Sequence, residues 1–284
     1  MNRNKRTFIK LIILILLSLN PHLVAEGTIS SFQSTDRPFG LDIVGPVYEA
    51  ASDADSLDFQ TNYLPEIQEI LQNNLSENTA LSSENLTSLS LDPSKLDLTY
   101  DSDVRVYFVG EGAGYHNSLG FNDSGSSIDS GNPLLIFPDA SHWRRDTTEE
   151  YPVNPGDFVD IGSFTSGTSL DFFLIADGAD NPIESRVFST DISANQDGIQ
   201  HVVSFAVEDS SYLILGFEDI YNGGDQDYND LMFAVDIGQA NVQTLIETSA
   251  LVPEPEEIFM MIIFGLFLVK HLITQQSSQA QIKF

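Results

Sequence analysis

Between Asp103 and Ile237 the sequence is divided into short apolar runs separated by Gly, Asp, Asn and Pro. Val, Ile, Phe and Tyr dominate these runs, as is typical of β-strands bounded by turns. No long helical pattern stands between them. Many short strands without intervening helices favour an all-β fold, an antiparallel β-sandwich or jelly roll. We expect nine strands, at residues 104–109, 115–121, 134–137, 158–164, 170–176, 186–189, 201–207, 212–217 and 231–237.

The charge of the chain limits its partners. The formal net charge is −30, and all 42 Asp and Glu residues lie between Glu26 and Glu257, together with only six of the 12 Lys and Arg residues. So acidic a surface repels nucleic acid and anionic lipid head groups, and we expect no nucleic-acid partner. The same repulsion opposes compaction, which bound divalent cations commonly offset. Cysteine is absent, which excludes disulfides and thiolate metal sites.

The N-terminal segment has the pattern of a secretory signal peptide. A basic start precedes the apolar run Leu11–Leu17, and Ala25 provides a small residue at the expected cleavage site. The alternative is an uncleaved anchor, but the run is much shorter than the roughly 20 residues that span a bilayer. We therefore assign residues 1–25 to a signal peptide and expect an exported protein.

The C-terminal segment, residues 252–284, contains Pro253-Glu254-Pro255, the apolar run Ile258–Val269 and then Lys270. It resembles the PEP-CTERM sorting signal, although Glu256-Glu257 and the missing Arg cluster depart from that pattern. The resemblance implies processing by an exosortase, and contact with the membrane through the hydrophobic helix at least before processing. A plain C-terminal anchor is the alternative. Both place the acidic part in the envelope, on the outer surface or in the extracellular matrix of a Gram-negative-type bacterium.

Two further segments flank the expected β domain at 103–238. Residues 26–102 are polar, but apolar side chains at helical spacing between Leu64 and Leu75 predict a short amphipathic helix near 62–75. This segment is either a partly helical lead-in packed on the β domain or a linker. We expect residues 239–251 to be a linker.

The strongest chemical signal is the loop between the last two expected strands. Paired carboxylates and a Gly-Gly turn precede an Asp-x-Asp-x-Asn-Asp run, so the candidate ligands are Glu218, Asp219, Asp225, Asp227, Asn229 and Asp230. Calcium takes roughly six to eight oxygen ligands, which such a loop can supply, whereas magnesium requires a tighter octahedron. The loop holds no Lys or Arg, so its carboxylates repel one another without an ion. We expect calcium here; the alternative is a solvated hairpin loop. The Gly and Glu spacing of an EF-hand is absent.

A second acidic segment, Asn195-Gln196-Asp197-Gly198, has by itself the pattern of a plain turn. Together with other motifs, however, it resembles the bacterial family called domain of unknown function 4114, over residues 103–238. The resemblance implies an exported domain with calcium-type acidic loops, makes Asn195 and Asp197 second-rank calcium ligands and implies no activity. It is carried, in order, by Val106–Tyr115, Asn117–Gly120, Leu135–Pro138, Gly156-Asp157, Phe172–Gly178, Asn195–His201 and Gly216–Asp230.

Signatures of catalysis are lacking. There is no His-Glu-x-x-His, Gly-x-Ser-x-Gly or cysteine nucleophile, so we expect no enzyme; a hydrolase with a carboxylate pair is the minor alternative. Trp143, Arg144 and Arg145 form a basic group that suits a sugar or a carboxylate, unless the arginines only pair with neighbouring acidic residues. The resulting hypothesis is a calcium-binding surface or matrix protein that serves adhesion by binding an extracellular glycan or peptide. The alternative is a structural envelope component in which calcium only stabilises the fold.

Overall fold

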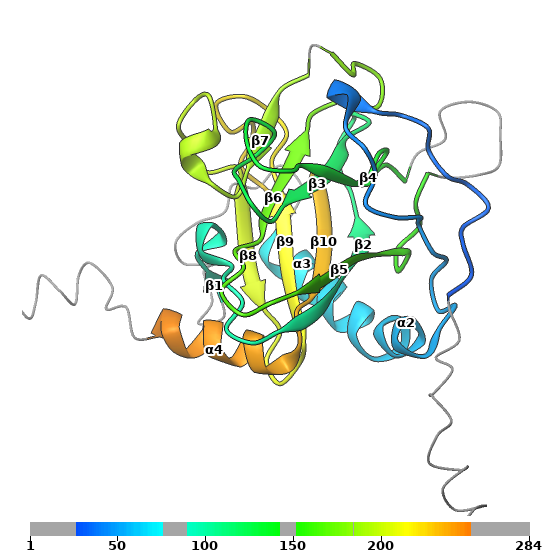
Figure 1. Ribbon diagram of the computed structural model, residues 1–284, viewed down its shortest axis with the longest axis vertical. Coiled ribbons are helices and arrows are strands. Elements are labelled where there is room, and N and C mark those ends of the chain that lie inside the picture. The colour runs from blue at the N-terminus through cyan, green and yellow to red at the C-terminus, as the bar shows by residue number, and fades with distance from the viewer. Residues whose placement is uncertain (1–26, 76–89, 143–151, 184, 251–284) are drawn as a thin grey trace, which may run out of the picture.

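The computed structural model describes residues 27–75, 90–142, 152–183 and 185–250 (Figure 1). The expected signal peptide, the PEP-CTERM-like segment and the group Trp143–Arg145 lie outside these ranges. Within them, no helix combines the length and the apolar character that crossing a bilayer requires.

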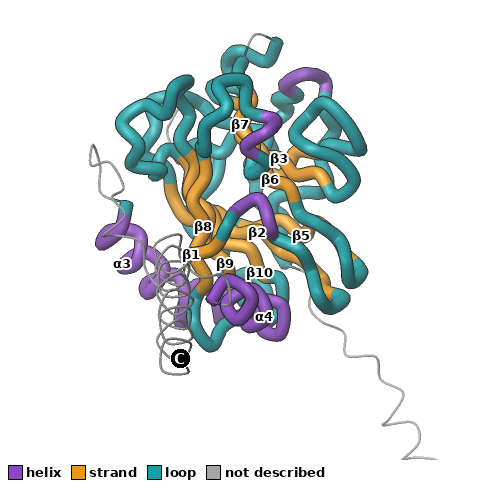
Figure 2. The backbone as a smooth tube through the Cα atoms, turned by 90° about the vertical axis from the view of Figure 1, so that its left-hand side faces the viewer, coloured by secondary structure: helices purple, strands orange, loops and turns teal. Residues whose placement is uncertain are grey.

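The described strands form two stacked antiparallel sheets, which confirms the predicted all-β sandwich (Figures 1 and 2). The larger sheet has the order β1-β8-β9-β10-β2-β5 and the smaller β4-β3-β6-β7. All nine predicted strands are present, and the two-residue strand β1 is an addition. The bounds are β1 Ser90–Leu91, β2 Ser102–Gly110, β3 Ser118–Asn122, β4 Leu134–Phe137, β5 Phe158–Phe164, β6 Asp171–Ile175, β7 Val187–Ser189, β8 Val202–Ala206, β9 Tyr212–Phe217 and β10 Leu231–Asp236.

The helices precede and follow the sheets in the chain. The predicted helix near 62–75 is the last part of a continuous stretch, in which Asp53 caps the first turn by accepting a hydrogen bond from the Ser56 amide at 2.7 Å. Short 3₁₀ turns lie at Pro38–Gly40, Pro93–Lys95 and Ile192–Ala194. The helical bounds are α2 Ala54–Asp58, the π-helical turn Phe59–Tyr63, α3 Leu64–Asn74 and α4 Gln239–Ala250.

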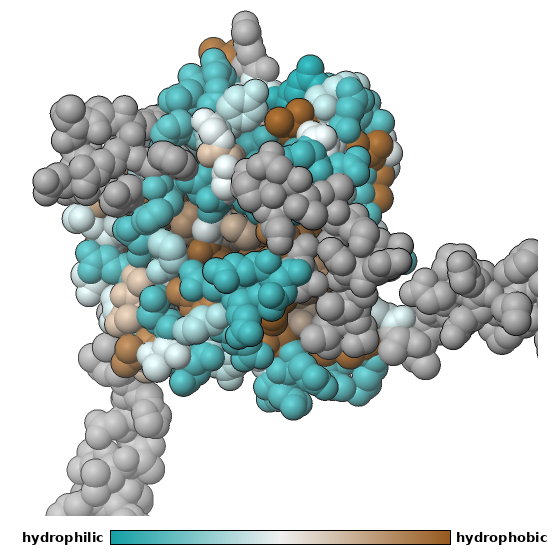
Figure 3. Space-filling view, turned by 180° about the vertical axis from the view of Figure 1, so that it is seen from behind, coloured by the Kyte–Doolittle hydropathy of each residue, from teal (hydrophilic) through white to brown (hydrophobic). Residues whose placement is uncertain are grey.

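The central strands of the larger sheet are apolar on both faces, because both faces of that sheet are covered. Along β2, Val106 and Phe108 point into the core between the sheets, whereas Tyr107 and Val109 belong to a second cluster on the outer face. The helical stretch completes that cluster with the buried side chains of Phe59, Leu64, Ile67, Leu71 and Leu75. Figure 2 shows α3 on the side of the larger sheet that faces away from the smaller one. Seen from behind, the described surface is largely hydrophilic, with apolar residues in scattered patches (Figure 3).

The N-terminal segment packs on the sandwich, in agreement with the packed lead-in and not with a free linker. Its residues Asp42–Tyr48, which we call the strap, run from one sheet to the other. The Val44 amide donates to the Leu135 carbonyl in β4 at 2.9 Å, and the Tyr48 amide donates to the Phe158 carbonyl in β5 at 2.8 Å. The strap therefore joins an edge strand of the smaller sheet, β4, to an edge strand of the larger one, β5.

Residues 239–250, expected as a linker, instead form α4, which closes one end of the sandwich (Figure 1). Val242 is buried in the core between the sheets, and Leu245 and Ile246 pack against it. Asn241 holds the start of the helix: its Oδ1 accepts from the Thr99 and Tyr100 amides, both at 2.9 Å. These contacts give the segment a fixed place that a linker would not have.

Candidate metal centre

The predicted ligand loop lies at the end of the sandwich opposite α4. It connects β9 to β10, and α4 follows the other end of β10. The strand register brings further loops to the same end, because Ser118 pairs with Ile175 and Val202 pairs with Phe217. Segments that are distant in the sequence therefore surround residues 218–230.

The Gly-Gly turn has the backbone conformation that the sequence indicates. Gly223 and Gly224 have φ of 81° and 42°, in the left-handed region that glycine adopts without strain. A Cβ atom at Gly224 would collide with Oε1 of Glu218. The turn therefore allows the backbone to approach the Glu218 carboxylate directly.

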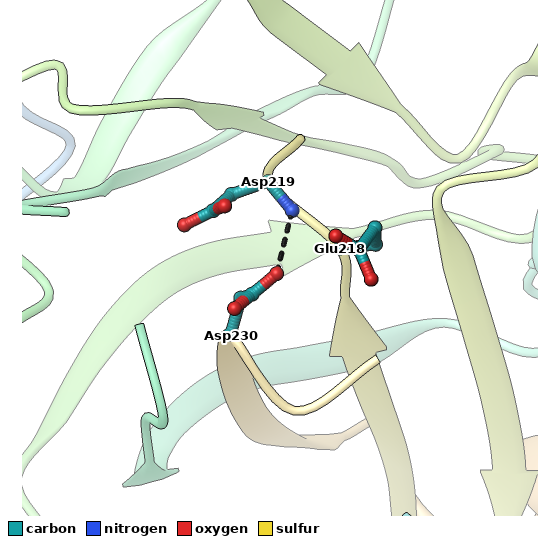
Figure 4. Close-up of side chains that lie close together, drawn as sticks. All are labelled: Glu218, Asp219 and Asp230. Atoms are coloured by element: carbon teal, nitrogen blue, oxygen red, sulfur yellow. Dashed lines mark hydrogen bonds between the residues drawn. The ribbon is translucent and has the colours of Figure 1, made fainter. Parts of the chain in front are cut away.

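The loop brings the predicted carboxylates together in two overlapping sets. One set contains Glu218, Asp219 and Asp230, and the other contains Glu218, Asp225 and Asp227; within each set, one oxygen per residue lies within 4.8 Å of the others. Figure 4 shows the first set, in which the Asp219 amide donates to Oδ2 of Asp230 at 2.8 Å. Glu218 is common to both sets and is therefore the centre of the cluster.

Glu218 is fully buried, with an exposed fraction of 0%. Its Oε2 accepts a hydrogen bond from the Gln226 amide at 3.0 Å. Its Oε1 is also buried, and no group of the described residues donates a hydrogen bond to it. A buried carboxylate oxygen without a partner is costly, and a cation among the neighbouring carboxylates would satisfy it.

The electrostatics of the cluster favour the same conclusion. Burial, together with the charge of Asp225, raises the pKa of Glu218 to about 7. Burial and the charges of Asp219 and Glu218 raise the pKa of Asp230 to about 8. Burial also raises the pKa of Asp219. Without a cation these groups resist joint ionisation at neutral pH, and a divalent ion would supply the missing positive charge.

Asn229 belongs to the loop but to neither carboxylate set. It is 6% exposed, its amide donates to Oδ1 of Asp227 at 3.2 Å, and its carbonyl accepts from the Gly112 amide at 2.9 Å. Its backbone thus holds Asp227 in place and ties the loop to the segment after β2.

Asn195 and Asp197, the second-rank candidates, are not part of either set. The Asn195 side chain is occupied locally, because it accepts from the Ser189 amide at 2.7 Å and donates to the Ile199 carbonyl at 2.9 Å. Oδ2 of Asp197 lies 2.9 Å from Nε2 of the buried His201 and accepts from the Asn222 amide at 2.9 Å. Burial alone would raise the pKa of Asp197, but these hydrogen bonds lower it. Asp197 thus braces the ligand loop from outside through Asn222, whereas the Asn195 side chain bonds only to its own segment and to β7.

Two residues next to the cluster had no predicted role. Asn117 donates from Nδ2 to Oδ2 of Asp219 at 2.8 Å and fixes that carboxylate. Burial, together with the charges of Asp139 and Asp219, raises the pKa of Glu111 to about 7. Both lie in motifs of the family resemblance, but that resemblance says nothing of their role. Only the fold brings them to the loop.

The fold and this cluster define an antiparallel β-sandwich with an acidic ligand-type loop at one end. Residues 164–238, from the end of β5 through β10, match the family described as Domain of unknown function (DUF4114). The matched part contains the complete loop between β9 and β10, whereas β2, β3 and β4 precede it. Comparisons with curated proteins and with solved structures found no match.

Proposed function

We propose that this protein is an exported, non-catalytic module of the cell surface or extracellular matrix that binds calcium in the cluster around Glu218. The observation that carries the proposal is the buried Oε1 of Glu218, which has no hydrogen-bond donor among the described residues and belongs to the residue that two carboxylate sets share. An acidic loop alone would not carry it, since solvated loops are often acidic.

The donor chemistry favours calcium over other metals. Both sets consist of carboxylates alone, and hard oxygen donors suit calcium, magnesium or manganese, in contrast to zinc or copper. Calcium also accepts backbone carbonyls and irregular geometry, which a single curled loop provides more easily than a strict octahedron.

The proposed biological role is adhesion, by binding an extracellular glycan or peptide. In its support, Asp225 is exposed while Glu218 and Asp227 are buried, so the cluster reaches the surface. The second candidate is a structural envelope component, favoured by the burial of Asp219 and Asp227 at 4% and 2% exposure. Export rests on the signal-type N-terminus, and sorting by an exosortase rests on the Pro-Glu-Pro segment and the apolar run after it.

Thermal unfolding in calcium and in EDTA tests the calcium site. In the full-length chain, calcium should raise the unfolding midpoint, because an ion bound only to the folded state stabilises it. The double variant Asp225→Ala, Asp227→Ala should lose most of this response. The matched control Glu66→Ala, Glu69→Ala removes two exposed charges from α3 and should keep it. An equal response of both double variants would refute the site.

A further inference from the structure

A cavity of about 450 Å³ opens beside the carboxylate cluster. This volume lies within the range of small-molecule sites, roughly 300–1,000 Å³. Asp219, a member of the cluster, forms part of its wall. The other lining residues used below are Tyr115, Asp177, Asn181, Arg186 and Tyr221.

The cavity presents aromatic side chains to solvent. Tyr115 is 46% exposed and Tyr221 is 37% exposed, although the large apolar side chains of the strands are buried. The guanidinium carbon of Arg186 lies 4.1 Å from the centre of the Tyr221 ring and holds that ring by a cation–π contact. An exposed, fixed aromatic face with a polar rim suits the C–H face of a sugar ring.

The polar groups of the wall are both donors and acceptors. Asp177 accepts from the His116 amide at 3.2 Å and from the Asn181 side chain, so its carboxylate is held in position. Arg186 can only donate, and an ionised carboxylate can only accept. A hydroxyl group does both, so a polyhydroxylated ligand can satisfy all of these groups at once.

The charges favour a neutral ligand. Among the described residues that line the cavity, Asp177 and Asp219 stand with a single cation, Arg186, in a chain with a formal charge of −30. An anion would face both carboxylates and the field of the whole molecule. A cation would face Arg186, and it would compete for Asp219 with calcium at the neighbouring cluster.

We infer that this cavity binds a neutral saccharide, with its ring against Tyr221 and its hydroxyls bonded to Asp177, Asn181 and Arg186. The inference gives the proposed binding module its ligand class and rests on that proposal. It places recognition on one side of the ligand loop, at residues that the metal does not require.

Saturation-transfer NMR and calorimetry of the full-length chain in calcium test the inference. The probes are glucose, galactose, mannose and N-acetylglucosamine, with N-acetylneuraminic acid as the anionic comparison. At least one neutral sugar should bind, and Tyr221→Ala should weaken it by about tenfold through loss of the stacking face. The control Tyr100→Ala removes a tyrosine that is 52% exposed and lies next to α4, and it should bind as the wild type does.

Several results would overturn the inference. These are the absence of binding by every neutral sugar, tighter binding of the anionic sugar, or equal affinities of the Tyr221→Ala and Tyr100→Ala variants. The calcium-dependent unfolding midpoint, measured on the same samples, separates the two proposals. A preserved calcium response without sugar binding rejects only the saccharide site, whereas Tyr221-dependent sugar binding without a calcium response rejects only the metal site.

Discussion

Replacing Glu218 with Gln should make the protein more stable than the wild type in EDTA but less stable than the wild type in calcium. The substitution keeps the shape of the side chain and an oxygen to accept from the Gln226 amide, which now donates to Oε2 at 3.0 Å. It removes the charge that both carboxylate sets share. The metal-free protein should therefore gain stability, whereas the calcium-bound protein should lose a ligand.

The size of the gain follows from the raised pKa. The pKa of Glu218 is about 7 in the fold against an ordinary value of 4.5. One pKa unit corresponds to about 1.4 kcal/mol, so ionising Glu218 costs the metal-free fold roughly 3–4 kcal/mol. For a chain of this size, 1 kcal/mol shifts the unfolding midpoint by about 2–4 °C, so we expect a rise of roughly 7–14 °C.

The assay is thermal unfolding at a pH of about 8, where Glu218 is ionised. In EDTA the Glu218→Gln variant should unfold at a higher temperature than the wild type, and in excess calcium at a lower one. The control Glu208→Gln changes an exposed residue after β8 and should follow the wild type in both buffers. A variant less stable than the wild type in EDTA, with an unchanged calcium response, would refute the reasoning.

Three further predictions concern pH, an ion pair and the C-terminal helix. In EDTA the free energy of unfolding should fall as the pH rises from about 5 to about 8. The reason is that the folded protein keeps protons on Glu218 and Asp230 that the unfolded chain releases at lower pH. In calcium this fall in the free energy of unfolding should be much smaller. Arg105→Ala should lower the free energy of unfolding, measured by chemical denaturation, by about 3 kcal/mol. The Arg105 side chain is 16% exposed, and its ion pairs at 2.9 and 2.6 Å include one with the buried Asp53. Lys95→Ala, in an exposed pair, should leave the denaturation midpoint almost unchanged, and similar losses for both variants would contradict this view. Asn241→Ala should lower the free energy of unfolding by about 1–2 kcal/mol, because it removes the part-buried hydrogen bonds to the Thr99 and Tyr100 amides near the start of α4, and an unchanged denaturation midpoint would refute this role.

Most of the sandwich could be predicted from local pattern, because its strands are short apolar or alternating runs between turn residues. The bounds of β9, Tyr212–Phe217, agree with the prediction for this reason. Strand β3 begins at Ser118 and not at Tyr115, because the His116 backbone bonds to the turn after β6: its amide donates to the Asp177 side chain and its carbonyl accepts from the Ala179 amide. Strand β1 has only two residues and depends on pairing with Phe205 and Ser204, which no local pattern shows.

Helix α4 could have been predicted. Val242, Leu245 and Ile246 stand at helical spacing, and they are the side chains that pack on the core. The carboxylates of the ligand loop were recognisable because a single short segment carries them. Asn117 could not be recognised as a residue of the site, since it lies 102 residues before Asp219 and only the register of two sheets brings the two together.

The strap has a consequence for how copies of this protein meet. Strands at the margin of an open sheet carry free amide and carbonyl groups that can recruit another chain and start polymerisation. In this protein, Val44 and Tyr48 already occupy such groups on Leu135 and Phe158, so one stretch of chain shields the same side of both sheets. Copies of this protein are thereby hindered from associating through these two edge strands. A fragment limited to residues 164–238 would lack the strap, β2 and most of β5, and would expose the flank of β10 that pairs with β2 in the intact protein.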